Sequence, residues 1–348
     1  MNKIKNIFLC TTEYHLFLSY HIINTLYESS KYESWIIMTT GMRKNVCNYN
    51  KSALFSNTKM TEVDWYELRT HYFLSSLLKE HCNNFFYFLS HFPVHRYIVR
   101  NFSKNGTKII LVQDGLKPYA PMEHFNLKSL LGIAYYNIIE CIKIKDYSGI
   151  FELINTSKYV NDKHINEVWL SHPQAFHHHT NKSQSIIKIP EFSEQSIKKL
   201  SIFYNYNLQI DFKPNDILYL TMPYLSHFEK LIEIRFLKEV LSKYPQNKLY
   251  IKFHPSRSMD KDLFYKELPH TFLLENINFP AELIIQNMNK AIIISFCSTA
   301  QLLNNPKCRF YYIYPIVGNC PLCPISNPNF MDHIKVISKV DELQFYDK

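Results

Sequence analysis

Short runs of apolar residues alternate with helix-like segments along the first half of the chain. The run 4–10 predicts a strand, and Thr12 stands where it can cap a helix whose apolar residues recur at helical spacing. Further apolar runs at 35–38, 109–112 and 168–170 predict additional strands, with helix-like segments between them. Strands that alternate with helices in this way predict a mostly parallel, doubly wound α/β sheet.

The second half repeats the pattern after a break rich in Ser, Lys and Pro. We place a domain boundary in this break, between about residues 200 and 214. A capping box of Ser226 and Glu229 then opens a helix that is predicted to reach Lys243. A second helix is predicted at 280–288, and strands are predicted at 217–220, 248–253, 271–274, 291–296 and 309–314. Because single cores stop growing at roughly 250 to 300 residues, the 348-residue chain is predicted to form two Rossmann-like domains, 1–205 and 206–348.

Composition and charge narrow the classes of partner. The chain is 46% hydrophobic and 20% charged, which is typical of folded globular proteins. Its net charge of +9 favours anionic ligands, anionic membrane surfaces or nucleic acid. The basic residues are scattered and match no nucleic-acid-binding signature, so we exclude nucleic acid as the main partner. The sequence leaves open whether the chain forms a homodimer.

Cysteine and histidine patterns give little support for a redox or metal site. The eight cysteines are dispersed, and several lie in apolar runs, which favours a reduced, cytoplasmic setting. Cys320 and Cys323 have redox spacing, but there is no second pair at zinc-finger spacing. The consecutive histidines 177–179 lack the spacing of three or four that places ligands on one helical face. We therefore expect no metal and no cofactor.

No segment predicts a membrane span. Charged and polar residues interrupt the apolar stretch 3–27, and no other run reaches about 18 uncharged apolar residues. Segment 125–145 has a broad apolar side with lysines around it, so it is the best candidate for a helix that lies on a membrane surface. We favour an ordinary buried helix there and keep peripheral contact with the cytoplasmic face of an inner membrane as the alternative.

Three short polar motifs follow three predicted strands, and ligands of open α/β sheets bind beyond the carboxyl ends of the strands. The first is Gln113-Asp114-Gly115, in which Asp114 can act as a general base or simply form an Asp-Gly turn. The second is His254-Pro255, in which the imidazole can contact or protonate a phosphate. Sixteen histidines are present, so a single His-Pro pair is weak evidence.

The third strand-end motif, Ser298-Thr299, also lies in the second half, together with a fourth motif that begins a helix. Ser298 and Thr299 precede a helix-like segment, where their hydroxyls and the nearby amides can bind phosphate or cap the helix. Glu282 lies in the first turn after Pro280, where a carboxylate can bind ribose hydroxyls or complement the helix dipole.

In order along the chain, these motifs resemble those of bacterial sialyltransferases, most closely the lipooligosaccharide sialyltransferase and capsular polysialyltransferase families. The resemblance implies a glycosyltransferase-B (GT-B) fold with an N-terminal acceptor domain and a C-terminal domain that binds a cytidine monophosphate (CMP) sugar. The family usually carries an acid at the position of Gln113, so this chain departs from the pattern and has one carboxylate in the motif.

The resemblance also implies roles for individual residues. Asp114 would be the base on an acceptor hydroxyl, His254 would assist departure of CMP across a shared cleft, and Glu282 would bind the ribose. Pro255, Ser298 and Thr299 would complete the donor site, and the acceptor side would be formed by Thr12, Tyr14, His15 and Gly115. The implied reaction is an inverting, metal-independent transfer of sialic acid, or a related nonulosonic acid, from CMP-sialic acid to an oligosaccharide or glycolipid of lipooligosaccharide or capsule.

Other functions remain open. A transferase that uses activated Kdo or a CDP-alditol would carry similar motifs at its strand ends. A noncatalytic binder of glycans or nucleotides is an alternative from a different class.

Overall fold

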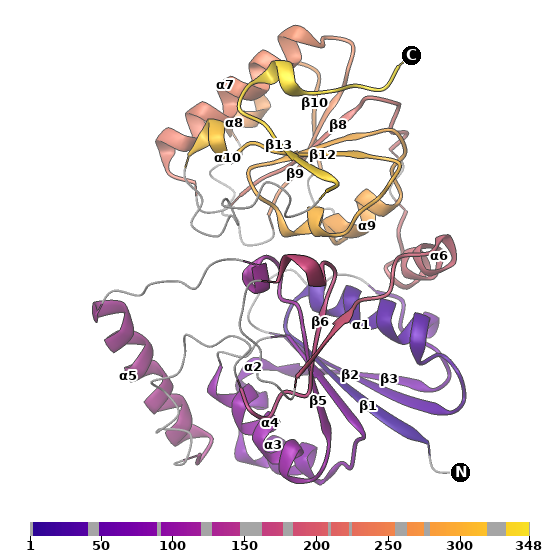
Figure 1. The fold of residues 1–348 in the computed structure, drawn as a ribbon, viewed down its shortest axis with the longest axis vertical. Coiled ribbons are helices and arrows are strands. Elements are labelled where there is room, and N and C mark those ends of the chain that lie inside the picture. Colours follow the sequence, from indigo (N-terminus) through magenta and orange to yellow (C-terminus); the bar gives the residue numbers. More distant parts are fainter. Residues whose placement is uncertain are drawn as a thin grey trace. The chain divides into compact units, whose positions relative to one another are not determined.

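The computed structural model describes residues 3–40, 49–88, 92–119, 127–146, 162–176, 184–207, 210–222, 225–254, 263–274, 279–318 and 332–347. The chain forms two compact units, Met1–Phe203 and Tyr204–Lys348. Each unit has its own parallel sheet, and each is described by itself (Figure 1).

The first unit contains a seven-stranded sheet with the order β3-β2-β1-β4-β5-β6-β7, in which all neighbouring strands are parallel. Central strands β1, β4 and β5 are almost wholly buried at their carboxyl ends, because their apolar runs are covered on both faces. The strands are β1 (Ile4–Cys10), β2 (Tyr32–Thr40), β3 (Thr58–Asp64), β4 (Asn84–Tyr87), β5 (Lys108–Val112), β6 (Glu167–Leu170) and β7 (Ser185–Lys188).

Helices cover both faces of this sheet. Helix α1 packs against α6, and α4 packs against α3 and α5 (Figure 1). Short 3₁₀ turns η1 (Lys51–Ala53), η2 (Lys117–Tyr119) and η4 (Pro173–Ala175) lie in the connections. The helices are α1 (Glu13–Leu26), α2 (Trp65–Leu68), α3 (His71–Lys79), α4 (Pro93–Lys104), α5 (Leu127–Lys143) and α6 (Glu194–Phe203).

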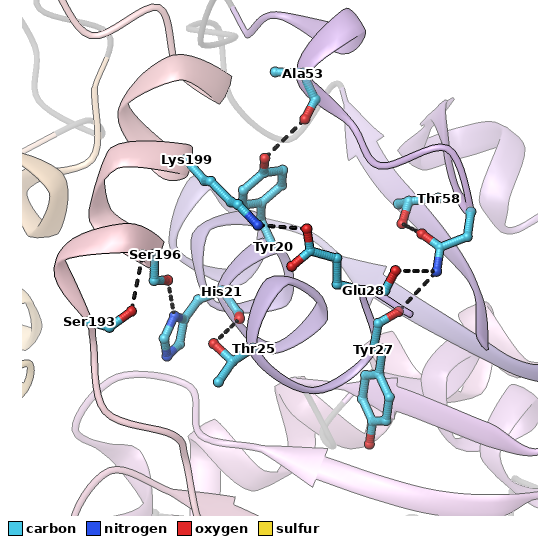
Figure 2. Close-up of polar contacts among 11 residues, drawn as sticks. Tyr20, His21, Thr25, Tyr27, Glu28, Ala53, Thr58, Ser193, Ser196 and Lys199 are labelled. Carbon is cyan, nitrogen blue, oxygen red and sulfur yellow. Dashed lines mark hydrogen bonds and ion pairs between the residues drawn. The ribbon is translucent and has the colours of Figure 1, made fainter. Parts of the chain in front are cut away.

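Helix α6 is fastened to α1 by buried polar contacts (Figure 2). His21 of α1 contacts the Ser196 hydroxyl through Nδ1 at 2.7 Å and the carbonyl of Pro190 through Nε2 at 2.8 Å. Its ring also stacks on Phe192, with centroids 3.7 Å apart. At the outer end of the contact, Lys199 pairs with Glu28. The last helix before residue 204 therefore belongs to the first unit.

The second unit contains a six-stranded parallel sheet with the order β10-β9-β8-β11-β12-β13. The strands are β8 (Ile217–Leu220), β9 (Leu249–Lys252), β10 (Thr271–Leu273), β11 (Ile292–Ser295), β12 (Arg309–Tyr312) and β13 (Ile334–Val336). The helices are α7 (His227–Lys243), α8 (Leu263–Lys266), α9 (Ala281–Gln286) and α10 (Tyr314–Val317), with 3₁₀ turns η6 (Thr299–Leu302) and η7 (Val340–Glu342). The predicted capping box opens α7, since Ser226 and Glu229 each bond to the other's backbone N–H.

Both sheets are doubly wound, so each has a point where the strand order reverses. This point lies between β1 and β4 in the first sheet and between β8 and β11 in the second. Ligands of such sheets bind beyond the carboxyl ends of the strands near the reversal. The prediction of a parallel α/β fold is confirmed, although β3, β4, β7 and β13 were not predicted.

Helix α5 differs from the buried helix that we favoured from the sequence. Its residues Leu131, Tyr135, Ile138 and Ile142 are 64%, 69%, 37% and 52% exposed, and their spacing places them along one side. Glu140 lies on the buried side and pairs with Arg69. The helix therefore buries Glu140 together with Cys141 and presents these apolar side chains outward.

Candidate functional site

Asp114 lies two residues beyond β5, at the carboxyl edge of the first sheet. The next residue, Gly115, has a φ of 59°, a left-handed conformation that glycine adopts without strain. This turn ends the strand and leaves the Asp114 side chain only 17% exposed. The Asp-Gly turn that we gave as the alternative to a general base is present, and it places a carboxylate near the reversal of strand order.

His15 is the residue that contacts this carboxylate. It lies in the first turn of α1, its side chain is fully buried, and its Nε2 is 3.1 Å from Asp114 Oδ1. The backbone N–H of Thr11 donates to His15 Nδ1 at 3.2 Å, and the Thr11 hydroxyl lies 2.9 Å from the same nitrogen. The ring stacks on Phe88, which follows β4, with centroids 4.3 Å apart and planes 9° apart. Segments after three adjacent strands thus meet around the His15 ring.

Gln113 is fully buried beside Asp114 and links three other segments. Its amide nitrogen donates to the Tyr14 hydroxyl at 2.5 Å. Its amide oxygen accepts from the Tyr119 hydroxyl and from the Ser171 backbone N–H, both at 2.7 Å. Burial raises the pKa of Tyr119, so its hydroxyl stays a donor. A neutral amide both donates and accepts here, which an ionised acid does not do.

The other residues predicted on the acceptor side lie close by. Thr12 caps α1 by accepting from the His15 backbone N–H at 3.2 Å, and Tyr14 extends from the first turn of the same helix. Thr12 and Tyr14 are half-buried, whereas His15 and Gly115 are buried. Contact of any of them with an acceptor stays a prediction, and the observed role of His15 is its bond to Asp114.

His254 lies at the carboxyl edge of the second sheet, two residues beyond β9. Its backbone N–H donates to the Thr221 hydroxyl at 3.1 Å, and Thr221 directly follows the neighbouring strand β8. The Thr221 backbone N–H in turn donates to the carbonyl of Lys252 at 3.1 Å. These bonds fix the backbone from which the half-buried His254 imidazole extends.

Ser298 and Thr299 lie beyond β11, on the other side of β8. They begin a four-residue 3₁₀ turn rather than the α-helix that we predicted, so the helix dipole contributes little. The Ser298 hydroxyl caps this turn by accepting from the Ala300 N–H at 3.3 Å. The Ser298 backbone N–H donates to the Ser295 hydroxyl at 2.8 Å, and Tyr312 donates to the Ser298 carbonyl at 2.9 Å. Ser298 and Thr299 are half-buried. Ser298 therefore caps the turn, and this role is compatible with contact of both hydroxyls with a phosphate.

Glu282 lies in the first turn of α9 and is buried. Burial raises the pKa of its carboxyl group to about 7, and the positive charge of Lys252 partly opposes this shift. Lys252 is the last residue of β9 and lies two positions before His254. Glu282 therefore interacts electrostatically with a side chain close to His254 in sequence. A carboxyl group with this pKa changes charge near neutral pH.

Some predicted residues lie outside the described part of the chain. These are Pro255, the histidines 177–179, and Cys320 and Cys323. Within the described ranges, no group of three or more His, Cys, Asp or Glu residues is arranged to hold a metal ion. The same ranges contain no helix that is both long enough and apolar enough to cross a membrane.

Sequence reasoning overlooked two residues of these edges, Phe88 and Thr221. The aromatic run 85–88 was a usable signal, because four aromatic residues in a row after a polar segment favour a buried strand. Thr221 gave a weaker signal as the first polar residue after the strand 217–220. The pairing of His15 with Asp114 spans 99 residues of sequence, and no local pattern indicates it.

Comparisons with known proteins agree with this architecture. The model of the alpha-2,8-polysialyltransferase family matches residues 3–308. No curated protein matches the sequence. The chain is similar in structure to the GT-B domain of a sialyltransferase from Photobacterium damselae, with a TM-score of 0.54 at 12% identity over 96% of this chain and 99% of that chain.

Two more solved structures show the same fold. One is a 2,6-sialyltransferase from a Photobacterium species, in complex with the donor product CMP and the acceptor substrate lactose; its TM-score is 0.51 at 10% identity, over 97% of this chain and 78% of that chain. The other is the glycotransferase of kitacinnamycin, with a TM-score of 0.51 at 9% identity, over 99% of this chain and 88% of that chain. At these identities the likeness shows the fold alone, which is GT-B with two Rossmann-like units.

Proposed function

The chain belongs to the alpha-2,8-polysialyltransferase family, and we propose that it transfers sialic acid, or a related nonulosonic acid, from its CMP-activated donor to a hydroxyl group of a surface glycan. The observation that carries the mechanistic part of this proposal is the position of Asp114. This carboxylate lies at the carboxyl edge of a doubly wound sheet, near the reversal of strand order. It is hydrogen-bonded to the buried His15.

In the proposed reaction Asp114 is the general base. The acceptor hydroxyl oxygen attacks the anomeric carbon of the donor sugar while Asp114 takes the hydroxyl proton. The bond between the anomeric carbon and the phosphate oxygen breaks, and CMP leaves with the bonding electron pair. Attack opposite the leaving group inverts the configuration at the anomeric carbon.

The leaving group is an anion, so its contacts should be cationic or hydrogen-bond donating. We assign this part to the second unit, in which His254, Ser298 and Thr299 lie beyond the neighbouring strands β9 and β11 on either side of β8. His254 would donate to the phosphate or protonate it, and the two hydroxyls would donate to its oxygens. Glu282 would accept from the ribose hydroxyls. In this proposal His254 neutralises the leaving phosphate and no metal ion does so.

We propose peripheral membrane contact through α5. The outward side chains Leu131, Tyr135, Ile138 and Ile142 form an apolar stripe, and exposed Lys143 and Lys145 follow at its carboxyl end. Apolar residues beside lysines suit an anionic lipid surface. Flotation with vesicles that contain anionic lipid should recover the wild-type protein, whereas replacement of Leu131 and Tyr135 by Ser should reduce the recovered fraction. Equal recovery of both proteins would refute the contact.

Nucleotide binding and product analysis separate the proposal from its alternatives. Calorimetric titration should show tighter binding of CMP than of CDP, whereas the reverse order would favour a CDP-alditol transferase. Incubation with CMP-sialic acid and a panel of galactosides and sialylated galactosides should give products that are one or more sialyl residues heavier. Nucleotide binding without any product from CMP-sialic acid or CMP-Kdo would favour the noncatalytic binder.

A further inference from the structure

We propose that His15 is a positioning residue that orients Asp114 for proton abstraction. This inference rests on the proposed function, because it assigns His15 a role through the base rather than through the acceptor. It follows from three features of the buried ring: its tautomer, its plane and its hydrogen bond to Asp114.

The contacts of Nδ1 fix the tautomer. A backbone N–H only donates, and the N–H of Thr11 points to His15 Nδ1 at 3.2 Å, so Nδ1 is the acceptor of this bond. The ring proton of the neutral imidazole is then on Nε2, which lies 3.1 Å from Asp114 Oδ1. His15 therefore donates to the carboxylate, and the backbone at the end of β1 dictates the direction of that donation.

The surroundings of the ring fix its plane. His15 is fully buried and stacks on Phe88 with an angle of 9° between the planes. A ring held on one face by an aromatic neighbour and on one edge by the backbone has little freedom to rotate about χ2. The N–H at the opposite edge therefore holds the Asp114 carboxylate at a defined angle. A protonated carboxyl group still has a carbonyl oxygen, so the bond is compatible with both states of the base.

His21 offers a matched control on the same helix. It too is buried in α1, stacks on a phenylalanine and has contacts at both ring nitrogens. Its partners, however, are Ser196 and the Pro190 carbonyl, which fasten α6. A variant of His21 therefore perturbs a similar buried environment without touching Asp114.

The test compares two substitutions of His15. His15→Phe keeps an aromatic ring against Phe88 and removes the donor, so kcat should fall about 10- to 100-fold with the KM for the CMP-sugar within about twofold. His15→Gln keeps an N–H group near the position of Nε2 and should recover kcat to within about fivefold of the wild type. His21→Phe should lower the melting temperature and leave kcat unchanged at a temperature where the protein is folded. Equal losses in the two His15 variants, or a loss confined to KM, would overturn the proposal.

A measurement on the wild-type protein covers the case in which His15→Phe does not fold. A two-bond ¹H–¹⁵N spectrum of protein labelled with ¹⁵N-histidine should show the Nε2–H tautomer for the signal that disappears in His15→Gln. A proton on Nδ1 of that residue would overturn the proposal. Asp114→Asn separates this inference from the proposed function: retained turnover in Asp114→Asn refutes the base, whereas lost turnover together with unchanged kcat in His15→Phe refutes only the positioning role.

Discussion

The carboxyl edges of the two sheets share one topology, but their polar groups are fixed in different ways. In the first unit, side chains bond to one another as well as to backbone: His15 to Asp114, and Gln113 to Tyr14 and Tyr119. In the second unit, the described contacts of the corresponding residues run mostly to backbone. The Thr221 hydroxyl accepts from the His254 N–H, and the Ser298 hydroxyl accepts from the Ala300 N–H.

This difference matches the two tasks that we propose. A general base needs its carboxylate aimed at one proton, and small errors in orientation lower the rate. A phosphate has several oxygens and accepts donors from many directions, so hydroxyl and N–H groups on a well-fixed backbone are sufficient. We therefore expect changes in the first edge to alter turnover and changes in the second edge to alter nucleotide binding as well.

The largest effect is expected for Asp114→Asn, which removes the base and keeps the shape of the side chain. Turnover should fall about 1,000-fold, a loss typical of general bases. Calorimetric titration with CMP should give a dissociation constant within about twofold of the wild type. Weakened CMP binding would break the proposed division of tasks between the two edges.

His254→Ala should affect both binding and rate. Loss of a donor to the leaving phosphate should lower kcat about 100-fold and weaken CMP binding about tenfold. Steady-state kinetics and calorimetry measure the two effects separately. Normal values for both would remove this histidine from the mechanism.

Thr299→Val should have a smaller effect, because it removes one neutral hydroxyl and nearly preserves the shape of the side chain. We expect CMP binding to weaken about fivefold to tenfold. Ser298→Ala is the comparison, because Ser298 also caps η6 and its loss should lower the melting temperature as well. An unchanged CMP affinity in Thr299→Val would exclude contact of its hydroxyl with the phosphate.

Glu282 should make nucleoside binding depend on pH. Its pKa of about 7 means that the carboxylate, the form that accepts from ribose hydroxyls, is lost as the pH falls through 7. Cytidine, which has no phosphate to titrate, should bind more weakly when the pH is lowered from about 8 to about 6, and Glu282→Gln should flatten this dependence. The stability effect has the opposite sign: the folded state binds this proton more tightly than the unfolded chain, so unfolding free energy rises as the pH falls from 7 toward 4.5. If cytidine affinity depended on pH equally in the wild type and in Glu282→Gln, contact of Glu282 with the ribose would be excluded.

The smallest effect on turnover is expected for His21, which has a structural task. Burial lowers its pKa from 6.5 to about 4, so the folded state resists protonation that the unfolded chain accepts. Its contribution to stability is present above pH 6.5 and is lost as the pH falls toward 4, a difference of about 3 kcal/mol. The unfolding free energy of the wild type should therefore fall more steeply over this range than that of His21→Phe. If unfolding free energy fell with pH equally in the two proteins, this contribution of His21 to stability would be contradicted.

The local patterns of the sequence predicted the elements that position these edges. The strands at 4–10 and 217–220 and the capping box of α7 agree with the structure, because apolar runs and capping residues act within a few positions. The motif residues at 114, 254 and 298 all lie at carboxyl ends of strands. Such placement is predictable because strand ends are marked by the change from apolar to polar residues.

Those local patterns could not predict contacts between segments that are distant in the sequence. The bond of His15 to Asp114 depends on the unpredicted strand β4 lying between β1 and β5, which brings Phe88 under the imidazole. The role of Gln113 also depends on partners from three segments. Helix α5 shows a different error, since Leu131 and Ile138 of its predicted apolar side are exposed, whereas Glu140 and Cys141 are buried.

Mass spectrometry of the products from CMP-sialic acid tests the central claim most directly. The wild-type protein should add sialyl residues to at least one member of the galactoside panel and release CMP in proportion, and Asp114→Asn should do neither at a comparable rate. CMP binding with no sialylated product from any acceptor, or equal product from the two proteins, would contradict the account.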